Sequence, residues 1–208
     1  MKDPRHQLIE LRVGDDPEAW RTAGFAVTDD QVVIGSTAIV LTGAGAGRGM
    51  TSISIDGLAA PSLDGVRLVR RRDPVPPAGD HPNGVTAWDH LVVLSPDVDR
   101  TTAALDGFGV PVRRVRRFEV AGTTQRQTFF WLGDVILEMV GADEAHGEGP
   151  ATAWGVALTC PDLDASVAAL GDRCGPAKDA VQPGRRIATL RTRDLDISIP
   201  VALMSPHR

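Results

Sequence analysis

Short apolar runs alternate along the chain with polar turns and with segments of helical periodicity. Two stretches share one pattern: VTAWDHLVVLSPDVDRTTAALDGFG at residues 85–109 and ATAWGVALTCPDLDASVAALGDRCG at residues 151–175. Each begins with a Val- and Leu-rich run that is typical of a strand, and each ends with apolar residues at helical spacing before a glycine. The Asp that follows each proline is a suitable helix N-cap. Each stretch therefore predicts a strand followed by an amphipathic helix.

Three further strands are predicted after each of these helices. In the first copy they cover residues 110–120, 127–132 and 135–140, and in the second residues 177–181, 186–191 and 195–203. Each copy therefore has the predicted order βαβββ, and internal repetition of this kind indicates stacked or paired modules.

The N-terminal region is a degenerate third copy. QLIELRV at residues 7–13 predicts a strand, DDPEAW at residues 15–20 starts a short helix with an early proline, and MTSISI at residues 50–55 predicts a later strand. Gly24-Phe25 matches Gly107-Phe108 in a frame that sets Gln7 opposite His90. VVIGSTAIVLTG at residues 32–43 matches FWLGDVILEMVG at residues 130–141, which sets Val40 opposite Glu138.

These repeats divide the chain into four segments. Residues 1–72 form a degenerate βαββ-type module, residues 73–84 a Pro- and Gly-rich linker, and residues 85–148 and 149–208 two βαβββ modules. A length of 208 residues with 42% hydrophobic content is sufficient for a sizeable core. The expected fold class is α+β, with repeated modules of mixed sheet and flanking helices.

Composition excludes several classes of partner. The net charge of −5 argues against nucleic acid, and RRVRR at residues 113–117 is interpreted as a solvated strand face. No apolar run is long enough for a signal peptide or a membrane span, so a soluble cytoplasmic protein with a small-molecule ligand is expected. The two cysteines are expected to be buried and reduced, and GAGAGRG at residues 43–49 lacks the Lys-Ser/Thr of a phosphate loop. His81 and His146 are expected to be exposed in loops, as are Arg185 and Arg186 in a solvated turn.

Paired βαβββ modules with DHLVV on a first strand and ILEMV on a fourth resemble the vicinal oxygen chelate superfamily, which includes glyoxalase I, bleomycin-resistance proteins and extradiol dioxygenases. The resemblance covers residues 84–205 well and residues 5–57 weakly. It implies that two modules curl into a β-sheet cup and that the protein forms a homodimer. It also implies that a divalent metal, where present, is held by one first-strand and one fourth-strand residue of each module, and that the metal chelates adjacent oxygens of a substrate.

His90 and Glu138 occupy these positions in the middle module, and their side chains suit Zn, Ni, Mn or Fe. The C-terminal module offers Gly155 or Val156 on its first strand and Ser198 on its fourth, none of which is a good ligand. Gln7 would supply a third ligand if the N-terminal copy packs with the middle module. A single His at a ligand position argues against an extradiol dioxygenase, whose iron takes two His and a carboxylate. The alternative is no metal at all, with His90 as a hydrogen-bonded core residue.

Glu138 is also the candidate catalytic residue, because a carboxylate in an apolar cup can act as a general base. Candidate substrate-binding residues are Gln127, Phe130, Trp131 and Arg186, although helix–sheet packing is the alternative role for the aromatic residues. Two functions stay open. One is a glyoxalase-type, metal-dependent lyase or isomerase, and the other is a metal-free protein of bleomycin-resistance type that binds a drug or metabolite.

Overall fold

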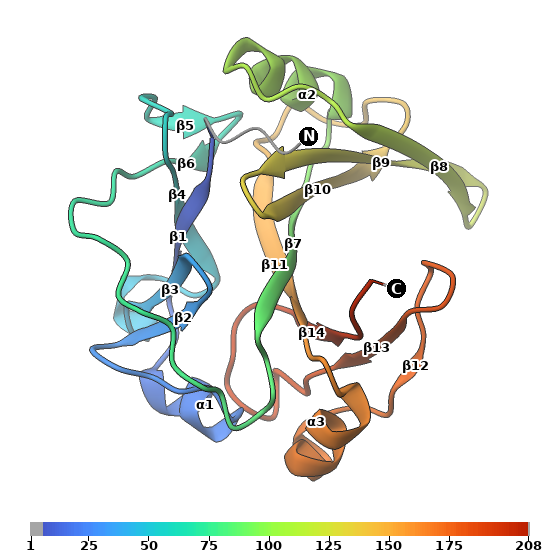
Figure 1. The fold of residues 1–208 in the computed structure, drawn as a ribbon. Coiled ribbons are helices and arrows are strands. Elements are labelled where there is room, and N and C mark those ends of the chain that lie inside the picture. Colours follow the sequence, from blue (N-terminus) through green and yellow to red (C-terminus); the bar gives the residue numbers. More distant parts are fainter. Residues whose placement is uncertain (1–5, 208) are drawn as a thin grey trace. The chain divides into compact units, whose positions relative to one another are not determined.

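The computed structural model describes residues 6–207 (Figure 1). The N-terminal third contains β1 (Leu8–Val13), α1 (Pro17–Thr22), β2 (Gln31–Ile34), β3 (Thr37–Leu41), the short 3-10 helix η1 (Ala44–Ala46), β4 (Met50–Ile55), β5 (Ser62–Leu63) and β6 (Val66–Arg67). The middle module contains β7 (Ala87–Leu94), α2 (Val98–Gly107), β8 (Arg114–Val120), β9 (Thr123–Leu132) and β10 (Val135–Ala142). The C-terminal module contains β11 (Thr152–Thr159), α3 (Leu163–Leu170), η2 (Gly171–Arg173), β12 (Lys178–Asp179), β13 (Arg186–Thr189) and β14 (Val201–Met204).

The element order confirms the α+β class and the two βαβββ repeats. Both repeat helices begin where the sequence places an Asp cap. The Asp97 carboxylate accepts a hydrogen bond from the Arg100 N–H at 2.9 Å, and the Asp162 carboxylate accepts one from the Ala165 N–H at 2.9 Å. These bonds satisfy backbone donors that have no partner within the helix, which is why each helix starts there.

The chain forms two compact units. Among the described residues, unit 1 comprises residues 6–9, 52–72 and 90–154, and unit 2 comprises residues 10–51, 73–89 and 155–207. The boundary between them falls within β1, β4, β7 and β11. The units therefore do not coincide with the four sequence segments, and the division into modules stays a description of the sequence repeats.

In unit 1, β7 pairs in parallel with β10, which pairs antiparallel with β9, and β9 pairs antiparallel with β8. Helix α2 contacts β9 and β10 (Figure 1). One face of these strands is apolar and almost fully buried; it carries Leu91, Val93, Phe130, Leu132, Leu137 and Met139. Because side chains alternate along a strand, the polar residues between them lie on the opposite face.

In unit 2, β11 pairs in parallel with β14, and the antiparallel strands β13 and β12 follow. The same unit holds the parallel pairing of β1 with β3 and the antiparallel pairing of β2 with β3. Strand β14 is shorter than the predicted strand at residues 195–203. The Leu195 N–H donates to the Arg191 carbonyl at 3.2 Å, and Asp196 has a left-handed φ of 56°, so these residues form a turn instead.

The linker histidine was expected to be exposed, and this expectation is wrong. His81 is buried within unit 2, where Nδ1 accepts a hydrogen bond from the Ala26 N–H at 3.1 Å and Nε2 lies 3.1 Å from the Val33 carbonyl. Desolvation lowers the pKa of His81, although the bond to Val33 and the charge of Asp80 oppose the shift. The neutral imidazole of His81 therefore connects the linker to β2 and to the residues before β2 through these two contacts.

Along residues 6–207, no helix combines the length and the apolar character that a membrane span requires.

Candidate small-molecule binding site

The face of the unit 1 sheet opposite α2 carries most of the candidate functional side chains that the sequence indicated. The strand register aligns Glu138 with Phe129, Val140 with Gln127, and Ile136 with Trp131. On the next strand, Arg114 and Arg116 stand opposite Phe129 and Gln127, and on the parallel neighbour His90 stands opposite Ile136. Residues opposite each other in a sheet share a face, so these side chains form one surface. We call it the Glu138 face.

A chain of polar contacts crosses the Glu138 face. Gln127 Nε2 donates to Glu138 Oε1 at 2.6 Å, and Arg116 donates to Gln127 Oε1 at 3.2 Å. His90 Nε2 lies 3.5 Å from the other carboxylate oxygen, Glu138 Oε2. Glu138 is only 8% exposed. A carboxylate this deeply buried needs partners for both oxygens, and here it has them.

A pocket of about 630 Å³ lies beside this network on the same face. Its lining includes Val140, which pairs with Gln127, and Gln125, which pairs with Ala142. Leu94, the parallel partner of Val140, and the loop residue His146 also line it. The pocket therefore begins one side-chain repeat beyond Glu138 on β10. Most of its wall is apolar, with amide and imidazole groups at a few points.

The structure brings together His90, Glu138 and Gln127, and places Trp131 on the same face. Gln7 lies elsewhere in unit 1: a Cβ atom added to Gly133 in the β9–β10 turn would be 2.9 Å from Gln7 Cγ. Gly133 is five residues before Glu138, which is roughly 15 Å along an extended strand. Gln7 Cγ therefore lies beside the β9–β10 turn rather than beside Glu138, and the role of Gln7 as a metal ligand stays a prediction.

Two other candidates also lie away from this network. Phe130 is 1% exposed and lies on the α2 face, in the packing role that was its alternative interpretation. Arg186 lies on β13 in unit 2, where its guanidinium donates to both oxygens of Asp164, at 2.7 and 2.6 Å, in the first turn of α3. Its neighbour Arg185 was expected in a solvated turn, but it is 3% exposed and ion-paired with the buried Asp89.

The pairing of β11 with β14 corrects the alignment of the C-terminal module. Counted back from the proline after each first strand, Ala157 corresponds to Val92. Val92 stands opposite Glu138, and Ala157 stands opposite Ala202. The counterpart of Glu138 is therefore Ala202 rather than Ser198, which precedes β14 and donates its backbone N–H to Asp15 at 3.0 Å. By the same count, the counterpart of His90 is Gly155.

The side chains present do not fit a firmly held metal ion. Within residues 6–207, no three His, Cys, Asp or Glu side chains are grouped so that they could hold one. The amide oxygen of Gln127 accepts from Arg116, and its NH₂ group faces Glu138. The C-terminal positions, Gly155 and Ala202, have no donor atoms in their side chains. Two protein ligands, His90 and Glu138, are fewer than the three that catalytic metal sites usually have.

Sequence reasoning missed Gln125, Val140 and His146 as pocket residues. Val140 could have been predicted because it lies two residues after Glu138 and therefore on the same face of the strand. Gln125 could have been predicted because it lies two residues before Gln127 on the antiparallel partner strand. His146 lies in a loop, and no periodicity of the sequence indicates its position.

Solved structures with a similar fold include several enzymes. A triple mutant of 4-hydroxymandelate synthase from Streptomyces coelicolor has a TM-score of 0.67 at 13% identity, over 98% of this chain and 93% of that chain. A catechol 2,3-dioxygenase has a TM-score of 0.57 at 10% identity, over 97% and 92% of the two chains. The chain has the vicinal oxygen chelate fold.

An extradiol ring-cleaving dioxygenase from B. fuscum shares the vicinal oxygen chelate fold with this chain, with a TM-score of 0.56 at 13% identity over 98% of this chain and 72% of that chain. No protein-family model matches the sequence, and no curated protein matches it significantly. At these identities the likeness establishes the fold alone, because one fold can carry many unrelated functions.

Proposed function

We propose that this protein binds a small organic molecule at the Glu138 face without a resident metal ion. The observation that carries the proposal is the satisfied chain of contacts from Arg116 through Gln127 to Glu138, next to a pocket of about 630 Å³. Pockets for small molecules are usually apolar, between about 300 and 1,000 Å³ in volume, and carry a few fixed polar groups.

The side chains of the face suggest which chemical groups the ligand presents. Glu138 and the Gln127 amide can accept and donate hydrogen bonds on the part of the face next to the pocket, so a ligand that extends from the pocket toward them would present a hydroxyl or N–H group. Phe129 and Trp131 provide flat apolar surface beside Glu138, which suits a planar ring. We also propose that Glu138 accepts a proton from a bound molecule, which is the catalytic role expected from the sequence.

Metal-dependent chemistry of lyase or isomerase type is the second candidate, and one observation favours it. His90 Nε2 and Glu138 Oε2 lie 3.5 Å apart, close enough for both atoms to contact one ion. Such an ion would lack a third protein donor of the usual kind, for the reasons given above. The two candidates differ in whether metal binding depends on His90 and Glu138.

A ligand screen by NMR tests the proposed site. Small planar compounds with hydroxyl or amide groups are screened against the native protein and against Val140→Trp, which fills the pocket. Ligands of this site should lose affinity at least about tenfold in Val140→Trp, because the indole occupies their volume. Val181→Trp is the matched control, since Val181 is 69% exposed outside the pocket. If every bound compound still binds Val140→Trp, the proposed site is wrong.

A further inference from the structure

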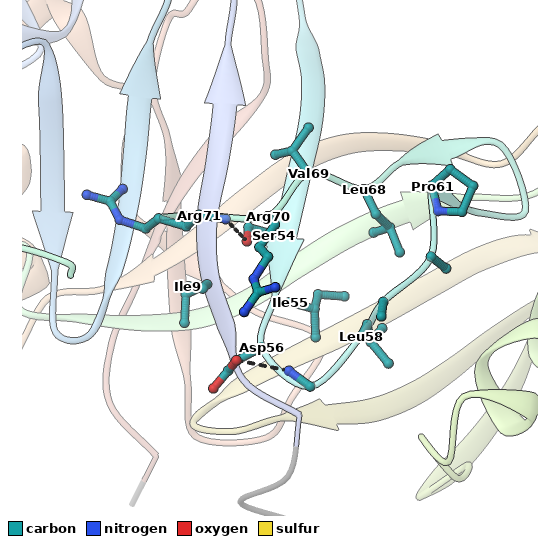
Figure 2. A pocket seen from close by; sticks show the side chains of 13 residues that line it. Ile9, Ser54, Ile55, Asp56, Leu58, Pro61, Leu68, Val69, Arg70 and Arg71 are labelled. Atoms are coloured by element: carbon teal, nitrogen blue, oxygen red, sulfur yellow. Dashed lines mark hydrogen bonds between the residues drawn. The ribbon is translucent and has the colours of Figure 1, made fainter. Parts of the chain in front are cut away.

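A second pocket of unit 1 has no part in the function proposed above. It has a volume of about 590 Å³ and lies between the loop at residues 56–61 and the segment at residues 68–71 (Figure 2). Ile9 of β1 and the C-terminal end of β4 also line it. The segment 68–71 runs along β4, because the Val69 N–H donates to the Ile53 carbonyl at 2.9 Å.

The walls of this pocket are mainly apolar. Ile55, Leu58, Pro61 and Leu68 gather on one side of it, as Figure 2 shows. Ile55 and Leu68 are nearly buried by the protein itself. An aliphatic or aromatic group of a ligand would bury the part of these side chains that is still exposed. Burial of apolar surface is favourable, so such a group would add to the binding free energy.

Two opposite charges stand at the other side of the pocket. Figure 2 shows the Arg70 guanidinium extending toward Ile9 and the Asp56 end of the pocket, whereas Arg71 extends to the left of the view and away from Asp56. Asp56 Oδ1 accepts a hydrogen bond from the Gly57 N–H at 3.0 Å, which holds the loop. Among residues 6–207, the side chains of Arg70 and Asp56 have no other ion-pair or hydrogen-bond partner.

We propose that this pocket binds an α-amino acid with an apolar side chain. The guanidinium of Arg70 would bind the carboxylate, the free carboxylate oxygen of Asp56 would bind the ammonium group, and the wall around Leu58 would cover the side chain. A simple carboxylic acid would meet the negative charge of Asp56, and a simple amine would meet the positive charge of Arg70. Only a ligand with both charges and an apolar group uses the whole pocket.

Calorimetric titration with three probes of matched shape tests this assignment. L-leucine carries both charges, 4-methylpentanoate lacks the ammonium group, and 3-methylbutylamine lacks the carboxylate. The expected result is saturable binding of L-leucine, about tenfold or more tighter than either of the other two, because each loses one charge-assisted contact. Glycine should also bind more weakly than L-leucine, because it leaves the apolar wall uncovered.

Two substitutions separate the charges. Arg70→Gln and Asp56→Asn should each weaken L-leucine binding about tenfold, and Asp56→Asn keeps an oxygen that can accept from the Gly57 N–H. The matched controls are Arg72→Gln and Asp106→Asn, which remove the same charges at exposed positions outside the pocket and should leave the affinity unchanged. Glu138→Gln should also leave it unchanged, so the outcome is independent of the Glu138 face.

Three results would overturn the proposal: no saturable binding of L-leucine, equal affinity for 4-methylpentanoate, or equal losses in the variants and their controls. The second result would indicate a site for simple acids, and the third an effect of net charge alone.

Discussion

The two βαβββ modules have the same order of elements and the same strand pairing, yet they place different chemistry at corresponding positions. The middle module has His90 and Glu138, and the C-terminal module has Gly155 and Ala202. The positions that face the helices are apolar in both: Leu91, Val93, Leu137 and Met139 in one module, and Val156, Leu158, Val201 and Leu203 in the other. The fold therefore depends on the apolar helix-facing positions, whereas residues on the opposite face can change without loss of the fold.

Local packing accounts for the difference at the first strand. A Cβ atom on Gly155 would lie 2.8 Å from the Pro200 carbonyl oxygen and 3.1 Å from Pro200 Cβ. A histidine cannot occupy this position unless β14 moves. The C-terminal module therefore has no room for a metal-ligating side chain at Gly155, the position that corresponds to His90 in the middle module.

The largest expected effect comes from adding a side chain at that position. Gly155→Ala should lower the free energy of unfolding by about 3 kcal/mol, because the new methyl group overlaps a backbone carbonyl that is hydrogen-bonded to the Val156 N–H. Urea unfolding measures the change. Gly149→Ala is the control, since nothing lies within 4 Å of its added Cβ. Equal stability of the two variants would show that β14 adjusts freely, and the two modules would then not differ in this respect.

A smaller loss is expected when the carboxylate of the middle module is removed. Glu138→Ala leaves the Gln127 NH₂ group without its acceptor, and this should cost about 1–2 kcal/mol in urea unfolding. Glu138→Gln should cost less, because its amide oxygen can still accept from Gln127. If Glu138→Ala is as stable as the native protein, the polar chain contributes nothing to the fold of unit 1.

The sequence predicted the elements better than the site. Asp97 and Asp162 cap the helices as expected, because capping depends on the nearest backbone donors. His90 and Glu138 meet because two parallel strands of one module bring them together. Gln7 Cγ lies beside the β9–β10 turn, and an ungapped frame does not encode how that turn packs. Ala202 was not recognised as the counterpart of Glu138 because residues around Asp196 form a turn, so β14 begins later in the sequence than predicted.

The modules should also differ in their response to alkali. The C-terminal module contains both thiols, and burial raises the pKa of Cys160 and of Cys174 above the usual value. The unfolded chain therefore releases these protons first, so stability is full below about pH 8.5 and falls as pH rises above it. Unfolding free energies measured at pH 8 and at about pH 10 should differ less in a Cys160→Ala/Cys174→Ala double variant. An unchanged difference would mean that the thiols are not responsible.

The smallest effect is expected in acid, and it belongs to the middle module. A hydrogen bond from Arg117 lowers the pKa of Asp143, although partial desolvation opposes the shift. The stability from this pair is present above the unfolded pKa of about 3.9 and is lost as pH falls through the lower folded value. Asp143→Asn should therefore flatten the acid limb of a stability–pH curve slightly. Asp106→Asn, at an exposed position of α2, should leave that limb as it is.

Metal titration of the metal-stripped protein is the most direct test of metal-free binding at the Glu138 face. Zn, Ni, Mn and Fe(II) are titrated calorimetrically into the native protein and into His90→Ala and Glu138→Ala. We expect no stoichiometric binding that depends on His90 or Glu138, because residues 6–207 supply no third His, Cys, Asp or Glu beside them and the Gln127 oxygen already accepts from Arg116. Stoichiometric binding that both substitutions abolish would contradict it, and would make His90 and Glu138 metal ligands.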